Sequence, residues 1–222
     1  MFDNIAGRYD FLNHLLSINI DKLWRKKAIK ILRPKKPEYI LDVATGTADF
    51  AIECVALNPK EIIGIDLSAK MLAVGKVKVS DKNLEDLIAL EKGDSENLPY
   101  KDNRFDAITV GFGVRNFENL KKGLSEMLRV LKPGGTLAVL EFSKPRVFPV
   151  KQLFSFYFHY VCPLIGKVFS KDDRAYTYLP ESVESFPEGD VFASILKEVG
   201  FKAVQCKSLT FGISSIYIGE KP

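Results

Sequence analysis

The sequence is poor in the residues that most often bind metals or form disulfides. It has 3 cysteines and 2 histidines among 222 residues. Cys54, Cys162 and Cys206 are odd in number and far apart, and no cysteine pair has metal-site spacing. His14 and His159 lie in different regions. We therefore expect no metal and no disulfide framework, and we interpret the cysteines as reduced core thiols of a cytoplasmic protein.

A strong net charge and long apolar runs are also lacking. The 32 Lys and Arg against 28 Asp and Glu leave only +4, which does not indicate nucleic-acid binding. The first residues lack the basic and then apolar regions of a secretion signal. No apolar run reaches the roughly 20 residues that a spanning helix needs. The length fits a single globular domain over residues 1–222.

From residue 39 onward, the sequence does contain a regular alternation of strand and helix patterns. Helices are predicted between the strands, one from about Ala69 and one over Leu120–Leu131, which Pro133-Gly134-Gly135 ends. Such an alternation is typical of a parallel sheet with helices on both faces. The predicted strands are the short apolar segments 39–44, 61–66, 87–90, 106–110 and 136–140.

The last part of the chain predicts one more helix and two more strands. The helix covers 191–199, with Pro187 in its first turn and Gly200 as its C-cap. Strands are expected near 203–206 and 215–219, and their connection has no helical pattern, so they form an antiparallel hairpin. A mostly parallel seven-stranded sheet with this hairpin is the outline of the Rossmann-like class I methyltransferase fold.

Polar residues follow the predicted strands, at the sheet edge where open α/β sheets bind ligands. Gly46 and Thr47 form a turn after the first strand, where backbone N–H groups can approach a ligand closely. Asp66 ends the second strand and can accept hydrogen bonds from a ribose diol. Asp94, with Ser95 beside it, can accept one from an adenine amine. Acids in three successive loops suit a neutral nucleoside with a cationic sulfonium, which describes S-adenosylmethionine.

The acids beside the first turn, Asp42 and Asp49, allow other interpretations. Asp49 is interpreted as a helix-start charge, and Asp42 either anchors the turn or contacts the cofactor indirectly. A nicotinamide reductase also has an acid after its second strand. Its pyrophosphate requires Gly-x-Gly-x-x-Gly, however, whereas this turn has the single glycine Gly46 between Ala44 and Ala48.

Two segments are more distinctive than the widespread Lys-Pro-Gly-Gly turn, namely Phe-Gly-Val-Arg-Asn at 112–116 and Glu-Phe-Ser-Lys-Pro at 141–145. Together with 1–6, 8–13, 41–49, 98–106 and 129–135, they resemble the demethylmenaquinone and ubiquinone C-methyltransferase family over nearly the whole chain. The resemblance implies that the residues touching S-adenosylmethionine are Thr47, Asp66, Asp94, Ser95 and Gly111. Because it begins at the first residues, we expect a short segment to precede them.

The resemblance also implies an activity: methylation of a polyprenyl quinol on a ring carbon, with S-adenosylhomocysteine as the second product. The substrate is either a naphthoquinol, giving menaquinone, or a benzoquinol on the way to ubiquinone, and we favour the first. Thr45 and Ala48 replace the outer glycines of the family turn, and the C-terminal strand lacks the family's common histidine. The altered turn leaves open a noncatalytic module that binds S-adenosylmethionine or lipid.

Carbon methylation requires an electron-rich ring, which a quinol becomes when a hydroxyl loses its proton. We predict Arg115 and Asn116 as catalytic residues. The Arg115 cation would stabilise the phenolate and Asn116 would orient the ring or a water molecule, and no metal is needed. The alternative is that Arg115 only holds its loop by pairing with an acid. Tyr9 either lines the substrate pocket or packs in the core.

Two helical segments are expected outside the sheet core: an N-terminal cap over 1–35 and an apolar insertion over 145–185. Residues 150–169 are apolar on both helix faces, and residues 144–171 include lysines and an arginine but no acid. An isoprenoid channel, peripheral contact of 145–170 with the inner face of the membrane, or a homodimer interface would use this surface. A buried lid helix is the alternative.

Overall fold

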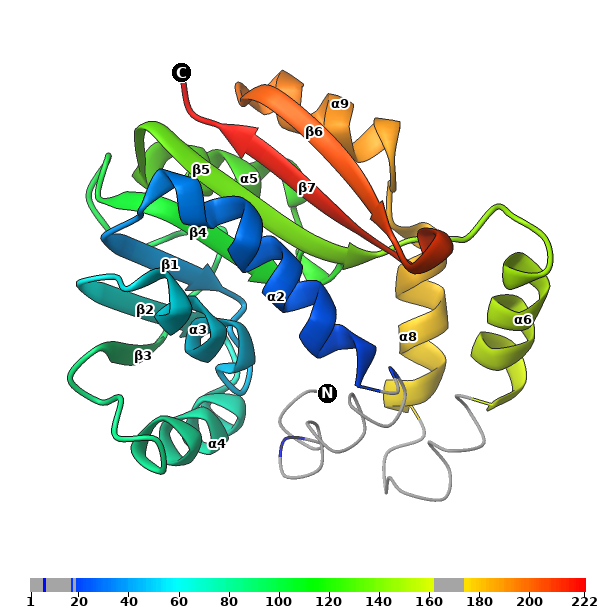
Figure 1. Ribbon diagram of the computed structural model, residues 1–222, viewed down its shortest axis with the longest axis horizontal. Coiled ribbons are helices and arrows are strands. Elements are labelled where there is room, and N and C mark those ends of the chain that lie inside the picture. The colour runs from blue at the N-terminus through cyan, green and yellow to red at the C-terminus, as the bar shows by residue number, and fades with distance from the viewer. Residues whose placement is uncertain (1–5, 7–16, 18, 162–173) are drawn as a thin grey trace.

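The computed structural model describes residues 6, 17, 19–161 and 174–222, and within them the chain forms a seven-stranded sheet (Figure 1). The strand order is β3-β2-β1-β4-β5-β7-β6. The first five strands are parallel, and β7 is antiparallel to both β5 and β6. This confirms the predicted fold class. The bounds are β1 Tyr39–Val43, β2 Glu61–Asp66, β3 Ile88–Lys92, β4 Phe105–Gly111, β5 Leu131–Phe142, β6 Lys202–Leu209 and β7 Ser214–Glu220.

Helices cover both faces of this sheet, because neighbouring residues of a strand point to opposite sides. Ile40 packs in the cluster formed with α2, α3 and α4, whereas Leu41 packs in the cluster formed with α5 and α9. In Figure 1, α2 crosses in front of the sheet while α5 and α9 lie behind it. The helix bounds are α2 Ile20–Leu32, α3 Asp49–Cys54, α4 Ala69–Ser80, α5 Leu120–Val130 and α9 Asp190–Val199.

The remaining helices lie between β5 and α9, within the predicted insertion 145–185, except for short 3-10 turns. α6 (Val150–Phe156) continues as the π-helical turn η4 (Tyr157–Val161), and α8 (Arg174–Ser185) stands between α6 and the sheet (Figure 1). No helix in the described parts of the chain is long and apolar enough to cross a membrane. The 3-10 turns are η1 Arg33–Lys35, η2 Val55–Leu57, η3 Val114–Asn116 and η5 Thr210–Gly212.

Some local predictions were wrong. Pro187 does not lie in the first turn of α9, because the helix begins at Asp190 after Gly189, whereas Gly200 is the C-cap as predicted. The helix α5 ends at Val130, and β5 already begins at Leu131, before the Pro-Gly-Gly turn. Here the Gly134 N–H donates to the Lys221 carbonyl at 2.9 Å, so the turn pairs with the end of the chain.

The cysteines were predicted as core thiols, and this holds for one of the two that the structure describes. Cys54 is fully buried on α3, where its sulfur lies 3.9 Å from the Thr109 hydroxyl. Cys206 is exposed, because it lies on β6, the edge strand of the sheet. Cys162 lies outside the described residues.

Candidate functional site

A cavity of about 290 Å³ opens at the carboxyl ends of the parallel strands. It lies where the loops after β1, β2, β3 and β4 meet, as expected for an open α/β sheet. The loop ends that the sequence singled out therefore converge on one space. The lining residues are Ala44, Gly46, Ile65, Asp66, Leu67, Met71, Gly93, Asp94, Ser95, Glu96, Gly111, Phe112, Gly113, Asn116, Phe117 and Glu118.

The turn after β1 owes its shape to left-handed backbone conformations. Gly46 has φ 56°, and Ala44 and Ala48 have φ 53° and 67°. Glycine takes this conformation without steric cost, whereas alanine does so at roughly 1–2 kcal/mol. Ala44 and Ala48 therefore strain the turn. The turn's Gly46 N–H reaches Asp66, and no atom lies within 4 Å of a Cβ built on Gly46.

Asp66 connects the first two loops of the cavity. Its Oδ2 accepts a hydrogen bond from the Gly46 N–H at 2.8 Å, and its Oδ1 accepts one from the Ser68 N–H at 2.8 Å. An ionised carboxylate has about four acceptor positions, so it can accept several donors at once. The half-buried Asp66 carboxylate is thus held in one orientation at the cavity wall.

The cavity is acidic. Its described lining includes the carboxylates of Asp66, Asp94, Glu96 and Glu118 and no basic side chain. Such a lining disfavours a pyrophosphate and favours a ligand that is neutral apart from a positive group. Leu67, Met71, Phe112 and Phe117 add apolar surface suited to a flat ring.

Thr47 was predicted to bind the cofactor, but it does not line this cavity. Its side chain is buried, and its hydroxyl receives a hydrogen bond from Lys78 Nζ at 3.3 Å. The same ammonium pairs with Asp49, whose other carboxylate oxygen lies 3.3 Å from the Arg25 guanidinium. Asp49 is the first residue of α3, which confirms its interpretation as a helix-start charge.

Asp42 holds the turn after β1 through hydrogen bonds of its carboxylate. It is buried, and its two oxygens accept hydrogen bonds from Thr45 Oγ1 at 2.6 Å and Thr109 Oγ1 at 2.7 Å. Burial raises the pKa of this carboxyl from 3.8 to about 6, although both hydroxyls counteract the rise. Asp42 does not line the cavity, which favours the anchoring role over cofactor contact.

We expect Asp42 to affect the pH dependence of stability. A carboxyl whose pKa is higher in the folded chain favours folding fully below pH 3.8, and this contribution is lost as the pH rises to about 6. Between these values we expect the unfolding free energy of the wild type to fall by roughly 3 kcal/mol relative to Asp42→Asn. Urea denaturation of both proteins across this pH range tests the expectation, and a constant difference would contradict it.

The loop after β4 brings the two predicted catalytic residues to different places. Gly111 is the last residue of β4, and a Cβ atom at this position would lie 2.9 Å from a carbon of the Phe50 ring. A residue larger than glycine would therefore collide with Phe50. Asn116, at the end of η3, lines the cavity. Arg115 is not among the lining residues, and its side chain is only 6% exposed.

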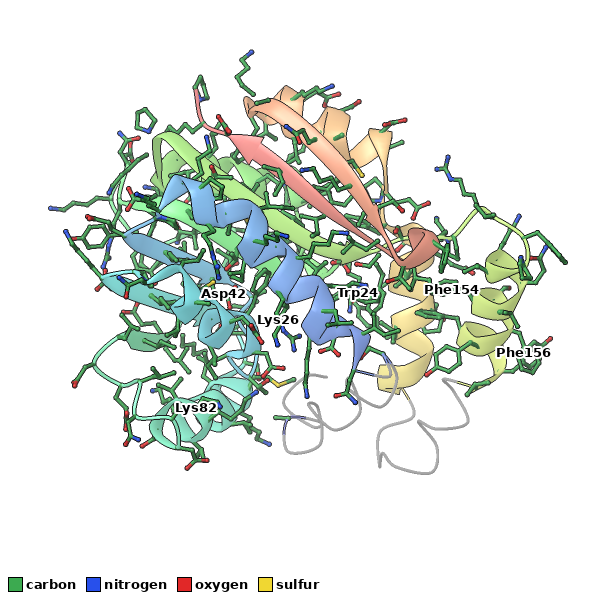
Figure 2. All side chains as sticks on the ribbon, in the orientation of Figure 1. Trp24, Lys26, Asp42, Lys82, Phe154 and Phe156 are labelled. Carbon is green, nitrogen blue, oxygen red and sulfur yellow. The ribbon has the colours of Figure 1, made fainter. Side chains whose placement is uncertain are left out.

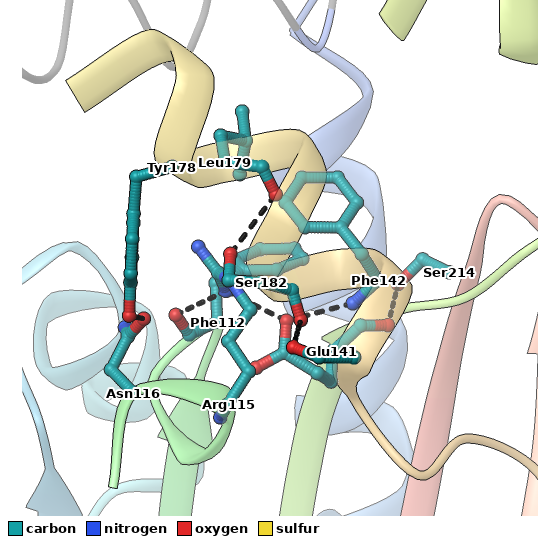
Figure 3. A network of polar contacts seen from close by, with 10 residues as sticks. Phe112, Arg115, Asn116, Glu141, Phe142, Tyr178, Leu179, Ser182 and Ser214 are labelled. Carbon is teal, nitrogen blue, oxygen red and sulfur yellow. Dashed lines mark hydrogen bonds and ion pairs between the residues drawn. The ribbon is translucent and has the colours of Figure 1, made fainter. Parts of the chain in front are cut away.

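The Arg115 side chain is fixed within the protein (Figure 3). Its Nη1 lies 2.7 Å from Glu141 Oε1 and also donates to the Phe112 carbonyl, while its Nε donates to Ser182 Oγ at 3.3 Å. Glu141 is fully buried at the end of β5. Burial raises the pKa of Glu141, and the Arg115 charge counteracts part of this rise. The pair favours the alternative interpretation, in which Arg115 holds its loop.

Helix α8 closes over this loop through two side chains one turn apart. Tyr178 Oη donates to Asn116 Oδ1 at 2.9 Å, and Ser182 receives the Arg115 hydrogen bond. Tyr178, Glu141 and Ser182 were not predicted from the sequence. Glu141 belongs to the Glu-Phe-Ser-Lys-Pro motif at 141–145, but nothing in the sequence marks the two residues of α8.

With this geometry in view, comparison with known proteins identifies the family. A model of the ubiE/COQ5 methyltransferase family matches residues 1–221. The chain belongs to this family. Among ubiE/COQ5 family members, the demethylmenaquinone methyltransferase of Bacteroides fragilis is 52% identical over 222 residues, covering 100% of this chain and 91% of that protein. The ubiquinone/menaquinone biosynthesis C-methyltransferase UbiE of Geotalea daltonii is 48% identical, with 100% and 94% covered.

Solved structures give the same fold. A SAM-dependent methyltransferase from Thermotoga maritima superposes with a TM-score of 0.68 at 21% identity, covering 100% of this chain and 98% of that one. One from Aquifex aeolicus gives a TM-score of 0.61 at 19% identity, with 83% and 82% covered. The predicted family, its methyltransferase class and the class I methyltransferase fold of this ubiE/COQ5 family member are confirmed.

Within the described residues, five of the six predicted cofactor residues line the cavity, namely Gly46, Asp66, Asp94, Ser95 and Gly111. Their contacts with a cofactor stay predictions. In the same residues, no group of three or more His, Cys, Asp or Glu could hold a metal ion. Tyr9 lies outside the described residues.

Proposed function

We propose that this ubiE/COQ5 family member transfers a methyl group from S-adenosylmethionine to a ring carbon of a polyprenyl quinol, converting demethylmenaquinol to menaquinol. The observation that carries the proposal is the convergence of four strand-end loops on one acidic cavity with Asn116 in its wall. The relatives named demethylmenaquinone methyltransferase, at 52% and 46% identity, support the naphthoquinol as substrate.

The chemistry of the lining fits S-adenosylmethionine. The Asp66 carboxylate would accept the ribose diol, and Asp94 with Ser95 would bind the adenine amine beside Leu67. Leu67 is 63% exposed, although it is a large apolar residue, and an adenine ring would cover it. Gly46 and Gly111 would allow the methionine part to approach the backbone closely. When bound, the sulfonium supplies an already activated methyl group.

The protein's own contribution is alignment and charge stabilisation. We assign Asn116 as the catalytic residue that donates a hydrogen bond to the quinol oxygen, since Asn116 lines the cavity and its side chain carries a donor nitrogen. Arg115 acts behind it as a positioning residue, because Glu141, Phe112 and Ser182 already engage its guanidinium. Its fixed positive charge still favours the phenolate form of a nearby quinol.

Incubation with methyl-labelled S-adenosylmethionine and chemically reduced demethylmenaquinone tests the reaction. We expect label in the naphthoquinol ring. The benzoquinol precursor of ubiquinone is the second candidate, because relatives at 45–48% identity are named for both quinones. Label in neither quinol, together with tight binding of S-adenosylmethionine, would instead support a noncatalytic module.

An enzyme with a lipid substrate needs access to the membrane, and the outer face of α6 is suited to that contact. Phe154 packs with the buried Phe158 at a ring distance of 4.2 Å and faces α8, whereas Phe156 points outward (Figure 2). The outer face also carries exposed apolar residues and, on α6 and the preceding loop, basic ones. We propose that it lies on an anionic membrane surface from the cytoplasmic side. Its residues are Lys144, Arg146, Val147, Phe148, Lys151, Leu153, Phe156 and Tyr160.

Vesicle binding tests this surface. We expect Phe148, Leu153 and Phe156, all replaced by serine, to lower affinity for vesicles with anionic lipid about 100-fold, because each side chain loses apolar contact. Methylation of a short-chain, water-soluble quinol should remain. The control replaces Val77 and Val191 by serine, since both are 59% exposed on other helices. Unchanged vesicle binding, with a dimer converted to a monomer, would instead make this face a homodimer interface.

A further inference from the structure

Tyr178 on α8 contacts the one predicted catalytic residue that lines the cavity. Its hydroxyl donates to Asn116 Oδ1 at 2.9 Å, over 62 positions in the sequence. A carboxamide has one acceptor oxygen and one donor nitrogen on opposite sides of a planar group. A donor bound to the oxygen therefore fixes the side on which the nitrogen lies.

The contact belongs to a two-point attachment of α8. Ser182, four residues later and hence on the same helix face, accepts from Arg115 Nε at 3.3 Å and donates to the Leu179 carbonyl at 2.9 Å. Figure 3 shows both side chains reaching from α8 to consecutive residues of η3. The helix thus holds Arg115 and Asn116 together.

The two attachments differ in what they can control. Arg115 is already fixed by the buried Glu141 and by the Phe112 carbonyl, so Ser182 adds little to its orientation. Asn116 is half-buried. Among the described residues, the hydroxyl that holds its carboxamide is that of Tyr178. Loss of the Tyr178 hydroxyl would let the carboxamide rotate.

We propose that Tyr178 is a positioning residue of the methyl transfer, which turns the Asn116 amide nitrogen toward the quinol oxygen. This inference rests on the proposed function. It assigns α8 a part in catalysis without direct contact between Tyr178 and the reacting atoms. It also makes the apolar insertion a part of the site as well as a cover over it.

A double-mutant cycle tests the assignment in the full chain. We expect Tyr178→Phe to lower kcat for quinol methylation about tenfold, the effect of one partly buried hydrogen bond, with little change in KM or in S-adenosylhomocysteine affinity. In the Asn116→Ala background the same change should have no further effect, because residues of one unit are not additive. Tyr39→Phe is the control, since Tyr39 begins β1 at the end of the sheet away from the cavity.

A second measurement is independent of turnover. The Asn116 side-chain amide resonance should move in the Tyr178→Phe protein and stay in place in Tyr39→Phe. An unmoved resonance, wild-type kcat in Tyr178→Phe, or an equal loss of rate with and without Asn116 would overturn the proposal. Absence of transfer by the wild type, with the resonance still moving, would contradict the reaction proposed above and leave the Tyr178 contact standing.

Discussion

Asp66→Ala is expected to lower the affinity for S-adenosylmethionine about 100-fold, because two hydrogen bonds from a ribose diol to a charged acceptor are lost together. The same change removes the acceptor of the Gly46 N–H, so the turn after β1 also loses its tie to β2. Isothermal titration with S-adenosylhomocysteine measures the effect. Turnover at saturating cofactor should fall much less.

A conservative variant and a control variant accompany this measurement. Asp66→Asn retains one acceptor oxygen without the charge, and we expect a smaller loss of about tenfold. Asp86→Ala should bind like the wild type, because Asp86 is exposed before β3, at the far end of the strand. Wild-type affinity in Asp66→Ala would mean that the ribose does not bind this carboxylate. The proposed orientation of the cofactor would then be wrong as well.

Arg115→Ala is expected to reduce both stability and turnover. It leaves the fully buried Glu141 without its cation, which typically costs about 3–5 kcal/mol of unfolding free energy. The loop at 112–116 also loses the tie that aligns Asn116, so kcat should fall about 100-fold. Cofactor affinity should change little, since Arg115 does not line the cavity. Denaturant unfolding and steady-state kinetics at pH 7 measure the two losses.

The double variant Arg115→Met with Glu141→Leu separates the two effects. Replacing a buried ion pair by apolar residues of similar size is often nearly neutral for stability, so most of the lost stability should return. Turnover should stay low, because the loop remains without its hydrogen bonds. Recovery of activity together with stability would mean that Arg115 and Glu141 only support the fold.

The sequence predicted the sheet well because its signals are local. Short apolar strands, helix periodicity and the Gly200 cap each depend on a few neighbouring residues. Ligands bind beyond the carboxyl ends of parallel strands, and this rule correctly predicted that Asp66 and Asp94 lie at one cavity. Gly46 lines the cavity while the Thr47 side chain is buried, and the contact of Thr47 with the cofactor stays a prediction.

The polar network around Arg115 could not be predicted in the same way. Glu141 lies 26 positions away and Ser182 lies 67 positions away, and their approach depends on how β5 pairs beside β4 and how α8 lies against the loop after β4. A motif shows that Arg115 matters, but it does not show whether the guanidinium faces ligand or protein. Tyr178 had no sequence signal, because a tyrosine in an amphipathic helix usually packs in a core.

A crystal structure with bound S-adenosylhomocysteine tests the central claim most directly. We expect the ribose hydroxyls within hydrogen-bonding distance of the Asp66 carboxylate, the adenine beside Leu67 and Asp94, and the sulfur toward the side of the cavity formed by Asn116. A nucleoside bound elsewhere, or one whose sulfur points away from Asn116, would contradict it.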